Sequence, residues 1–373
     1  MQGLLFWANS FCRSTMAFYD GLGRAFGEPI EVVVFNRDSS HREKLGFSKE
    51  EFSRMNISYL CEIADLEGFI KAHKGYSHLF GRYQQGELCA EIMRKVHAQG
   101  DRFAVMSEAP CNMERGFRRI LKKFYIRFVL PHRVQEVVRD ADFIINLSGD
   151  ADGLFKLGWA PRKVIPCGYY PPRLLGSRAE KRTVVHWEDF VILLTGQHTW
   201  HRDPLMLLKA LVELEKKGMK YRCMITQSGP LTAKMQRFAE KNQLRGVSFT
   251  GFLPMADVVR LYETCSVFVG TGRDEPWGMR LNDALGCAAP LLVSEGMGGY
   301  RLAKEYGCGF TFPRRDYHEL ARCLERMITD RALYLSVAEH AFSASQKIDP
   351  YIKSNEVAHS IKERFPIWGN DEQ

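Results

Sequence analysis

Short apolar runs alternate with longer polar stretches along the first half of the chain. The runs are rich in β-branched and aromatic residues, as in Val32-Val33-Val34-Phe35. Such runs are typical of strands buried on both faces of a parallel sheet, and the polar stretches are long enough for crossover helices. The pattern therefore predicts a doubly wound α/β layer. The expected strands are residues 3–8, 30–35, 77–81, 102–107, 143–148 and 163–166.

A second series of the same kind follows a break in the pattern at residues 167–172. One of its helices is well marked, because Asp203 is a favourable N-cap, Pro204 suits the first helical position and Gly218 can end the helix. The last segment, residues 351–368, has helical character and is expected to return to the first domain. The strands expected in this second series are residues 190–195, 221–226, 247–250, 267–270, 290–293 and 309–312.

The two series predict two Rossmann-like domains, and 373 residues are enough for two hydrophobic cores. The expected first domain is residues 1–172 together with a C-terminal helix at residues 349–373. The expected second domain is residues 173–348. Two such domains in tandem form a cleft, and ligands of parallel sheets bind at the carboxyl ends of the strands.

Composition narrows the class of protein. Apolar residues make up 45% of the chain and charged residues 26%, which is ordinary for a folded soluble protein. No apolar run approaches the length of a membrane span, and the N-terminus has no basic region of a signal peptide, so we expect a cytoplasmic protein. The ten cysteines form no CxxC pair. They predict buried thiols rather than a disulfide framework or a zinc site.

The formal net charge of +8 favours anionic partners such as a nucleotide, a phospholipid or a nucleic acid. Residues 115–133 contain seven Lys or Arg and no acid, with apolar residues at helical spacing. A basic amphipathic helix of this kind can lie on an anionic bilayer. The alternative is a helix that buries its apolar stripe in the domain and leaves its charges solvated. No nucleic-acid recognition motif is present, so nucleic acid is not expected as a partner.

The most informative stretch is residues 271–287, where a strand ends and a loop leads into a helix near Gly278. A helix N-terminus offers unpaired N–H groups and a partial positive charge, which suits a diphosphate. Glu275 is expected in the loop and Asp283 one to two turns into the helix. Two acids flanking a phosphate cradle can hold hydroxyls of a sugar and a ribose; the alternative is a loop carboxylate and a solvated helix Asp.

This stretch resembles the E-x7-E signature of retaining GT-B glycosyltransferases of the group 1, family-four-like type, with Asp283 in place of the second Glu. The resemblance extends over nearly all of residues 185–335. It includes a strand, basic loop and helix with Gly196 and Arg202, a Ser228-Gly229-Pro230 turn, and residues 249–253, which match the loop that faces the base.

The resemblance implies a role for each matching residue. Glu275 would lie beside the transferred sugar, and Asp283 would bind ribose hydroxyls. Arg202 would neutralise charge on the leaving diphosphate, which is often the largest catalytic contribution. The implied catalytic residues are Glu275, Arg202 and Glu108. The implied donor-binding residues are Gly196, Gln197, Arg202, Gly251, Phe252, Leu253, Glu275, Gly278, Met279, Arg280, Asp283 and Arg13.

Several positions depart from the family pattern. Gln197 stands where the family usually has Arg, and either Arg280 or Arg273 is a candidate to replace that charge, the alternative being a solvated surface arginine. Glu108 stands where the family commonly has His. It is a candidate contact to the donor sugar or base toward the acceptor, or else a loop or helix-capping carboxylate. Arg13 lies where the family has a glycine-rich loop and is a candidate phosphate ligand.

Three other motifs point to different chemistry. Gly21-Leu22-Gly23 lies too far past the first strand for a dinucleotide loop. Asp150-Ala151-Asp152 resembles the metal-binding DxD of the GT-A fold, but in a GT-B protein it would open a helix. His198 and His201 have no further ligands nearby for zinc. We therefore expect neither a metal nor a cofactor.

The resemblance implies retaining transfer from a nucleotide-diphosphate sugar, with UDP favoured, to a glycan acceptor. In many bacterial members the acceptor is lipid-linked, which implies surface polysaccharide or lipopolysaccharide biosynthesis at the inner face of the cell membrane. The alternatives are a catalytically degenerate nucleotide-binding or scaffold protein of the same fold, and a GT-B epimerase or phosphorylase.

Overall fold

The computed structural model of the chain describes residues 2–36, 49–83, 86–180 and 190–369. The chain forms two compact units. Unit 1 comprises residues 1–110, 120–172 and 349–373, and unit 2 comprises residues 111–119 and 173–348. The sequence-based boundaries place residues 111–119 in the first domain, whereas in the structure this segment packs in unit 2.

Unit 1 is built on a seven-stranded, all-parallel sheet with the strand order β3-β2-β1-β4-β5-β6-β7. All six strands predicted in this half of the chain are present. The sequence analysis missed β3, because this edge strand is only partly buried and has no continuous apolar run. The strands are β1 (Leu4–Ser10), β2 (Ile30–Asn36), β3 (Asn56–Tyr59), β4 (Ser77–Phe80), β5 (Arg102–Ser107), β6 (Ile144–Asn146) and β7 (Val164–Pro166).

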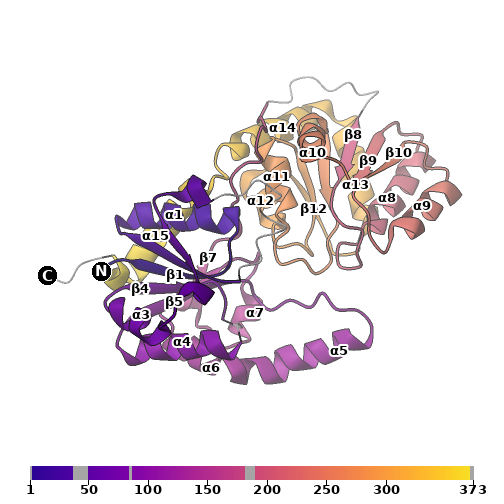
Figure 1. Cartoon of the computed structure of the whole chain (residues 1–373). Helices are drawn as coiled ribbons and strands as arrows, with labels where there is room; N and C mark the ends of the chain where they lie inside the picture. Colours follow the sequence, from indigo (N-terminus) through magenta and orange to yellow (C-terminus); the bar gives the residue numbers. More distant parts are fainter. Residues whose placement is uncertain (1, 37–48, 84–85, 181–189, 370–373) are drawn as a thin grey trace. The chain divides into compact units, whose positions relative to one another are not determined.

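Helices cover this sheet, and the C-terminal helix lies alongside the first one (Figure 1). The Tyr351 hydroxyl donates to Asp20 Oδ2 at 3.0 Å. Gly21 allows this close packing, because a Cβ at Gly21 would collide with the Ser354 side chain. The Gly21-Leu22-Gly23 motif is therefore a helix-packing feature. The helices are α1 (Arg13–Phe26), α3 (Leu66–Ala72), α4 (Glu87–Ala98), α5 (Phe117–Phe124, across the boundary of the two units), α6 (Leu130–Asp140), α7 (Asp152–Phe155) and α15 (Pro350–Arg364).

Unit 2 is built on a six-stranded, all-parallel sheet with the strand order β10-β9-β8-β11-β12-β13. All six strands predicted in this half are present. Because every strand runs in the same direction, the loops that follow them open at one edge of the sheet. The strands are β8 (Val191–Leu194), β9 (Arg222–Thr226), β10 (Val247–Gly251), β11 (Val267–Gly270), β12 (Leu291–Ser294) and β13 (Gly309–Phe312).

The helices of unit 2 include one correction to the sequence analysis. Pro204, not Asp203, is the N-cap of α8, and Asp203 takes a positive φ of 44° and pairs with Arg273 instead. Gly218 lies just after the end of this helix, as predicted. The helices are α8 (Leu205–Lys216), α9 (Thr232–Lys241), α10 (Met255–Thr264), α11 (Arg280–Gly286), α12 (Tyr300–Tyr306), α13 (Tyr317–Thr329) and α14 (Arg331–Ser345). Within the described residues, no helix has both the length and the apolar content to cross a bilayer.

Candidate functional site

The predicted donor-site residues of unit 2 lie at the carboxyl edge of its sheet, in loops, at a strand end or in the first turn of α11. Gly196 and Gln197 follow β8, and the stretch from Glu275 to Met279 connects β11 to α11. Gly251 ends β10, where its φ is 70°, and the Phe252 side chain that follows is exposed. The parallel topology therefore brings three segments that are separated in the sequence to the same edge of one sheet.

Arg280 connects two of these loops. This first residue of α11 donates from its guanidinium to the Thr195 carbonyl oxygen at the end of β8. It also donates to the Glu275 carboxylate, with 3.1 Å between Nη2 and Oε2. Gly196, at a φ of 104°, leaves room for this side chain, because a Cβ there would collide with the Arg280 guanidinium.

Glu275 is held on both its backbone and its side chain. Its N–H donates to the Gly296 carbonyl oxygen, and its own carbonyl oxygen accepts from the Gly298 N–H, both at 2.9 Å. Its carboxylate is 12% exposed and lies between Arg280 and Arg202, whose Nε is 3.8 Å from Glu275 Oε1. The acid is therefore fixed between two guanidinium groups and keeps access to solvent.

Arg202 has an unused donor. Its buried Nε has no hydrogen-bond partner among the described residues. Burial lowers the pKa of the Arg202 guanidinium, the nearby Arg280 lowers it further, and Glu275 opposes both. Two arginines against one carboxylate leave a positive surplus, and such guanidinium groups bind phosphate oxygens well.

Asp283 lies in the first turn of α11. Burial raises the pKa of its carboxyl to about 7, and Arg280 partly opposes this rise. The side chain keeps partial exposure, and no hydrogen bond from a described residue contributes to the pKa shift of its carboxyl. Its carboxylate oxygens are therefore available to accept hydrogen bonds from a ligand.

The start of α11 offers further donors. Among the described residues, the backbone N–H groups of Met279 and Arg280 have no backbone acceptor. The buried Trp277 Nε1 donates to Asn282 Oδ1 at 2.8 Å and ties the loop to the helix. The loop that carries Glu275 is therefore firmly attached to α11.

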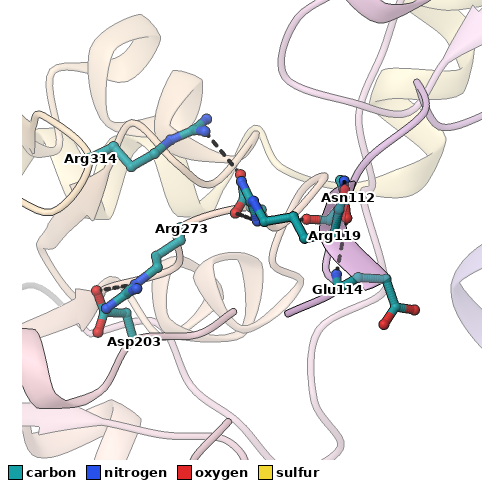
Figure 2. Close-up of polar contacts among 7 residues, drawn as sticks. Asn112, Glu114, Arg119, Asp203, Arg273 and Arg314 are labelled. Atoms are coloured by element: carbon teal, nitrogen blue, oxygen red, sulfur yellow. Dashed lines mark hydrogen bonds and ion pairs between the residues drawn. The ribbon is translucent and has the colours of Figure 1, made fainter. Parts of the chain in front are cut away.

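The structure distinguishes the two arginines that sequence analysis offered as replacements for the charge missing at Gln197. Arg273 points to Asp203, with which it pairs, and it stacks on Trp200 with 4.0 Å from its Cζ to the ring centroid (Figure 2). Arg280 instead lies against Gly196, next to Gln197 in the chain. Arg280 is therefore the better-placed replacement.

Asp274 precedes Glu275 in the chain and holds the same loop through hydrogen bonds to two arginines. Sequence analysis did not single it out. Arg119 donates to its Oδ2 at 2.8 Å and Arg314 to its Oδ1 at 2.9 Å. The Asn112 side chain also donates a hydrogen bond from Nδ2 to the Arg119 carbonyl oxygen at 2.9 Å (Figure 2). This contact closes residues 111–119 into a compact turn, called the hook below. No local sequence signal marks this contact between residues 155 positions apart.

Two predicted residues lie in unit 1, where each already has a partner. The Tyr169 hydroxyl donates to Glu108 Oε1 at 3.0 Å. Burial and Glu108 both raise the pKa of Tyr169, so this phenol stays protonated and orients the carboxylate. Arg13 donates from Nε to Glu51 at 2.7 Å. A role for Arg13 toward a phosphate therefore requires this ion pair to open or to share its donors.

The motifs considered for metal chemistry have local structural roles. Asp150 Oδ1 accepts the backbone N–H of Asp152 at 3.1 Å, in the turn that opens α7. His198 is fully buried between Thr232 Oγ1 at 2.8 Å and the Thr226 carbonyl oxygen at 3.1 Å. In the part of the chain that the structure describes, no three His, Cys, Asp or Glu residues are grouped to hold a metal ion.

The basic amphipathic segment is helical, and its apolar side faces solvent. It forms α5 and continues through a π-helical turn at Tyr125–Val129 into α6. The structure rules out the alternative of a stripe buried in the domain, because the stripe residues are between 53% and 71% exposed. These residues are Phe117, Ile120, Leu121, Phe124 and Phe128.

Comparison with known proteins places this site in context. Residues 177–344 match the family of group 1 glycosyl transferases. Over 100 residues the chain is 32% identical to the serotype-specific mannosyltransferase WbdA of Escherichia coli, covering 26% of this chain and 12% of WbdA. The chain thus corresponds to only a small part of that relative's length.

Solved structures resemble the chain over almost its whole length. Alr3699/HepE of Anabaena in complex with UDP has a TM-score of 0.68 and 15% identity, covering 97% of this chain and 100% of that one. The lipopolysaccharide outer core galactosyltransferase WaaB has a TM-score of 0.65 and 14% identity, covering 96% of this chain and 99% of that one. These similarities confirm the predicted fold, GT-B with two Rossmann-like parallel sheets.

Proposed function

We propose that this chain, a GT-B protein with a group 1 glycosyl transferase domain, transfers a sugar from a nucleotide-diphosphate donor to a glycan acceptor with retention of configuration. The observation that carries the proposal is the group of Arg202, Glu275 and Arg280 at the carboxyl edge of the unit 2 sheet. It combines a carboxylate held in place with two guanidinium groups and an unused buried donor.

In this mechanism the chain stabilises the leaving diphosphate electrostatically. The Arg280 and Arg202 guanidinium groups, together with the N–H groups of Met279 and Arg280, bind the diphosphate oxygens as negative charge grows on them. Glu275 lies beside the transferred sugar and orients it. Asp283, once ionised, accepts hydrogen bonds from the ribose hydroxyls. The acceptor hydroxyl attacks the anomeric carbon from the face that the diphosphate leaves, and its proton passes to the departing phosphate oxygen or to Glu108. The proposed step uses no metal ion.

UDP is the proposed nucleotide. The Anabaena protein of the same fold binds UDP, UDP with glucose, and UDP-glucose. Gly251, Phe252 and Leu253 are the proposed contacts to the base, because the exposed Phe252 ring after β10 can stack on it. Gln197 and Gly278 complete the proposed donor site.

The proposed acceptor is a glycan of a surface polysaccharide or lipopolysaccharide. The names of WbdA, a serotype-specific mannosyltransferase, and of WaaB, a lipopolysaccharide outer core galactosyltransferase, support this class. Glu108, oriented by Tyr169, is the proposed contact on the unit 1 side, either to the donor sugar or as a base toward the acceptor hydroxyl.

We also propose that the chain is located in the cytoplasm and binds the anionic inner face of the cell membrane through α5. Its exposed apolar stripe is accompanied by basic residues, and no acid lies between Arg115 and Arg133. Apolar insertion and attraction of basic side chains to anionic lipids act together at such a helix. A lipid-linked acceptor would then be held near the site.

Thermal unfolding with UDP, GDP, ADP and their sugars, each with EDTA, tests the function. A ligand that binds the native state raises the melting temperature. We expect UDP to do so without a metal, and Arg202→Ala and Asp283→Ala to abolish the shift. No shift with any nucleotide would contradict the proposal and favour the scaffold alternative. A shift that EDTA removes would instead implicate a metal at Asp150 and Asp152.

A further inference from the structure

Unit 2 has a pocket of about 400 Å³ outside the proposed donor site. Its lining includes five basic side chains, and none of the lining residues is Arg202, Glu275, Arg280 or Asp283. The basic residues are Arg115, Lys209, Lys234, Arg273 and Arg315.

The charges of this pocket are largely uncompensated. Asp203 is its only acidic lining residue, and it is already paired with Arg273. Among the described residues, the other four cations form no ion pair with a carboxylate. Four cations gathered around one cavity repel one another, and an anion inside the cavity would relieve that repulsion.

Two aromatic rings contact three of the five cations. Arg273 and Arg115 both lie over the Trp200 ring, with 4.0 Å and 4.8 Å from Cζ to the ring centroid. Lys209 lies over the Tyr317 ring, with 5.3 Å from Nζ to the centroid. Cation–π contacts of this kind orient basic side chains without neutralising them. The positive charge stays available to a ligand.

The N-termini of three helices add to the positive charge around the pocket. Residues in the first turns of α8, α9 and α13 line the pocket, and these helices have 12, 10 and 13 residues. Helix N-termini carry a partial positive charge. Arg115 is brought to the pocket by the hook of residues 111–119, which Arg119 fastens to Asp274.

We propose that this pocket binds a phosphate group of a ligand other than the nucleotide. A phosphomonoester matches the cavity, because guanidinium and ammonium groups pair with its several oxygens. The phosphate belongs either to a soluble phosphorylated sugar or to a lipid headgroup. The inference does not depend on the proposed glycosyl transfer.

The test compares Lys209→Glu/Lys234→Glu with Lys216→Glu/Lys241→Glu. The control pair lies on the same two helices, changes the net charge equally and is remote from the pocket lining. Calorimetry with glucose 6-phosphate, in the absence of UDP and at saturating UDP, measures the soluble source. Co-sedimentation with phosphatidylcholine vesicles, with and without phosphatidic acid, measures the lipid source.

We expect the pocket variant to lose affinity about tenfold or more for one of the two probes, because the variant replaces two cations that would contact the phosphate with carboxylates that repel it. The control variant should bind that probe like the unaltered chain, and UDP should bind all three proteins alike. Which probe responds identifies the source of the phosphate. Absence of binding to both probes, equal losses in both variants, or displacement of glucose 6-phosphate by UDP would each overturn the proposal. Because UDP affinity is measured separately, failure here is distinct from failure of the donor site.

Discussion

The Arg280 guanidinium occupies the space that a Cβ at Gly196 would take, so a larger residue at Gly196 would displace it. From this position it donates to the Thr195 carbonyl oxygen and to the Glu275 carboxylate. One glycine at the end of a strand thus lets a helix residue join two loops of the proposed donor site.

Gly196→Ala should displace Arg280 and weaken UDP binding by roughly tenfold, the value of one charged hydrogen bond. It should also destabilise the fold by about 1–2 kcal/mol, because an L-residue at positive φ is strained. Gly218→Ala is the matched control, since Gly218 also has a positive φ, of 67°, but nothing lies within 4 Å of its added Cβ. Calorimetry measures the UDP affinity of both variants. Equal affinities would show that Gly196 does not position Arg280 for UDP binding.

Glu275→Gln should separate binding from turnover. Removing the carboxylate takes away the negative charge between Arg202 and Arg280, so UDP should bind as tightly as before or more tightly. Sugar transfer should fall by about 100-fold or more, because the group proposed to orient the sugar is lost. The measurements are the UDP dissociation constant and the initial rate of transfer. A large loss of UDP affinity with an unchanged rate of transfer would contradict the proposed role of Glu275.

Asp283→Asn should change how stability depends on pH. Burial raises the pKa of the Asp283 carboxyl from 3.8 to about 7, so the folded state binds its proton more tightly than the unfolded state. The unaltered chain should therefore lose stability relative to Asp283→Asn as pH rises from about 4 to about 7, with little further change above that range. Chemical denaturation at several pH values measures this difference.

The same carboxyl should make nucleotide binding pH-dependent. The ionised form accepts ribose hydroxyls, so UDP affinity of the unaltered chain should rise between about pH 6 and pH 8 and that of Asp283→Asn should rise less. Calorimetric titrations across this range give the two slopes. Parallel slopes would exclude Asp283 as the titrating group.

Leu121→Glu/Phe124→Glu should abolish binding to anionic vesicles, because it places charges in the exposed apolar stripe of α5. Leu88→Glu/Phe155→Glu is the matched control, since both side chains are exposed apolar groups elsewhere in unit 1. Co-sedimentation with vesicles that contain phosphatidylglycerol measures the difference. If both double variants sediment like the unaltered chain, α5 is not the membrane contact.

The sequence by itself determined the strands and the position of the acidic residues along the proposed donor-site loop. Buried parallel strands require continuous apolar runs, which are visible locally, and all twelve predicted strands are present. The spacing of Glu275 and Asp283 likewise follows from one loop and one short helix. β3 was not predicted, because this edge strand is only partly buried and therefore has no continuous apolar run.

Only the tertiary structure decided which side chains meet. Asp203 looked like a helix cap, yet its pairing with Arg273 across 70 positions outweighs that local preference. Arg280 rather than Arg273 reaches Gly196, and the hook of residues 111–119 joins Asp274 of unit 2. Such contacts depend on where distant loops come together at the sheet edge, and the exposure of the α5 stripe depends on what the fold leaves uncovered. The pattern of apolar and polar residues within one element predicts neither the contacts between distant loops nor the exposure of a helix face.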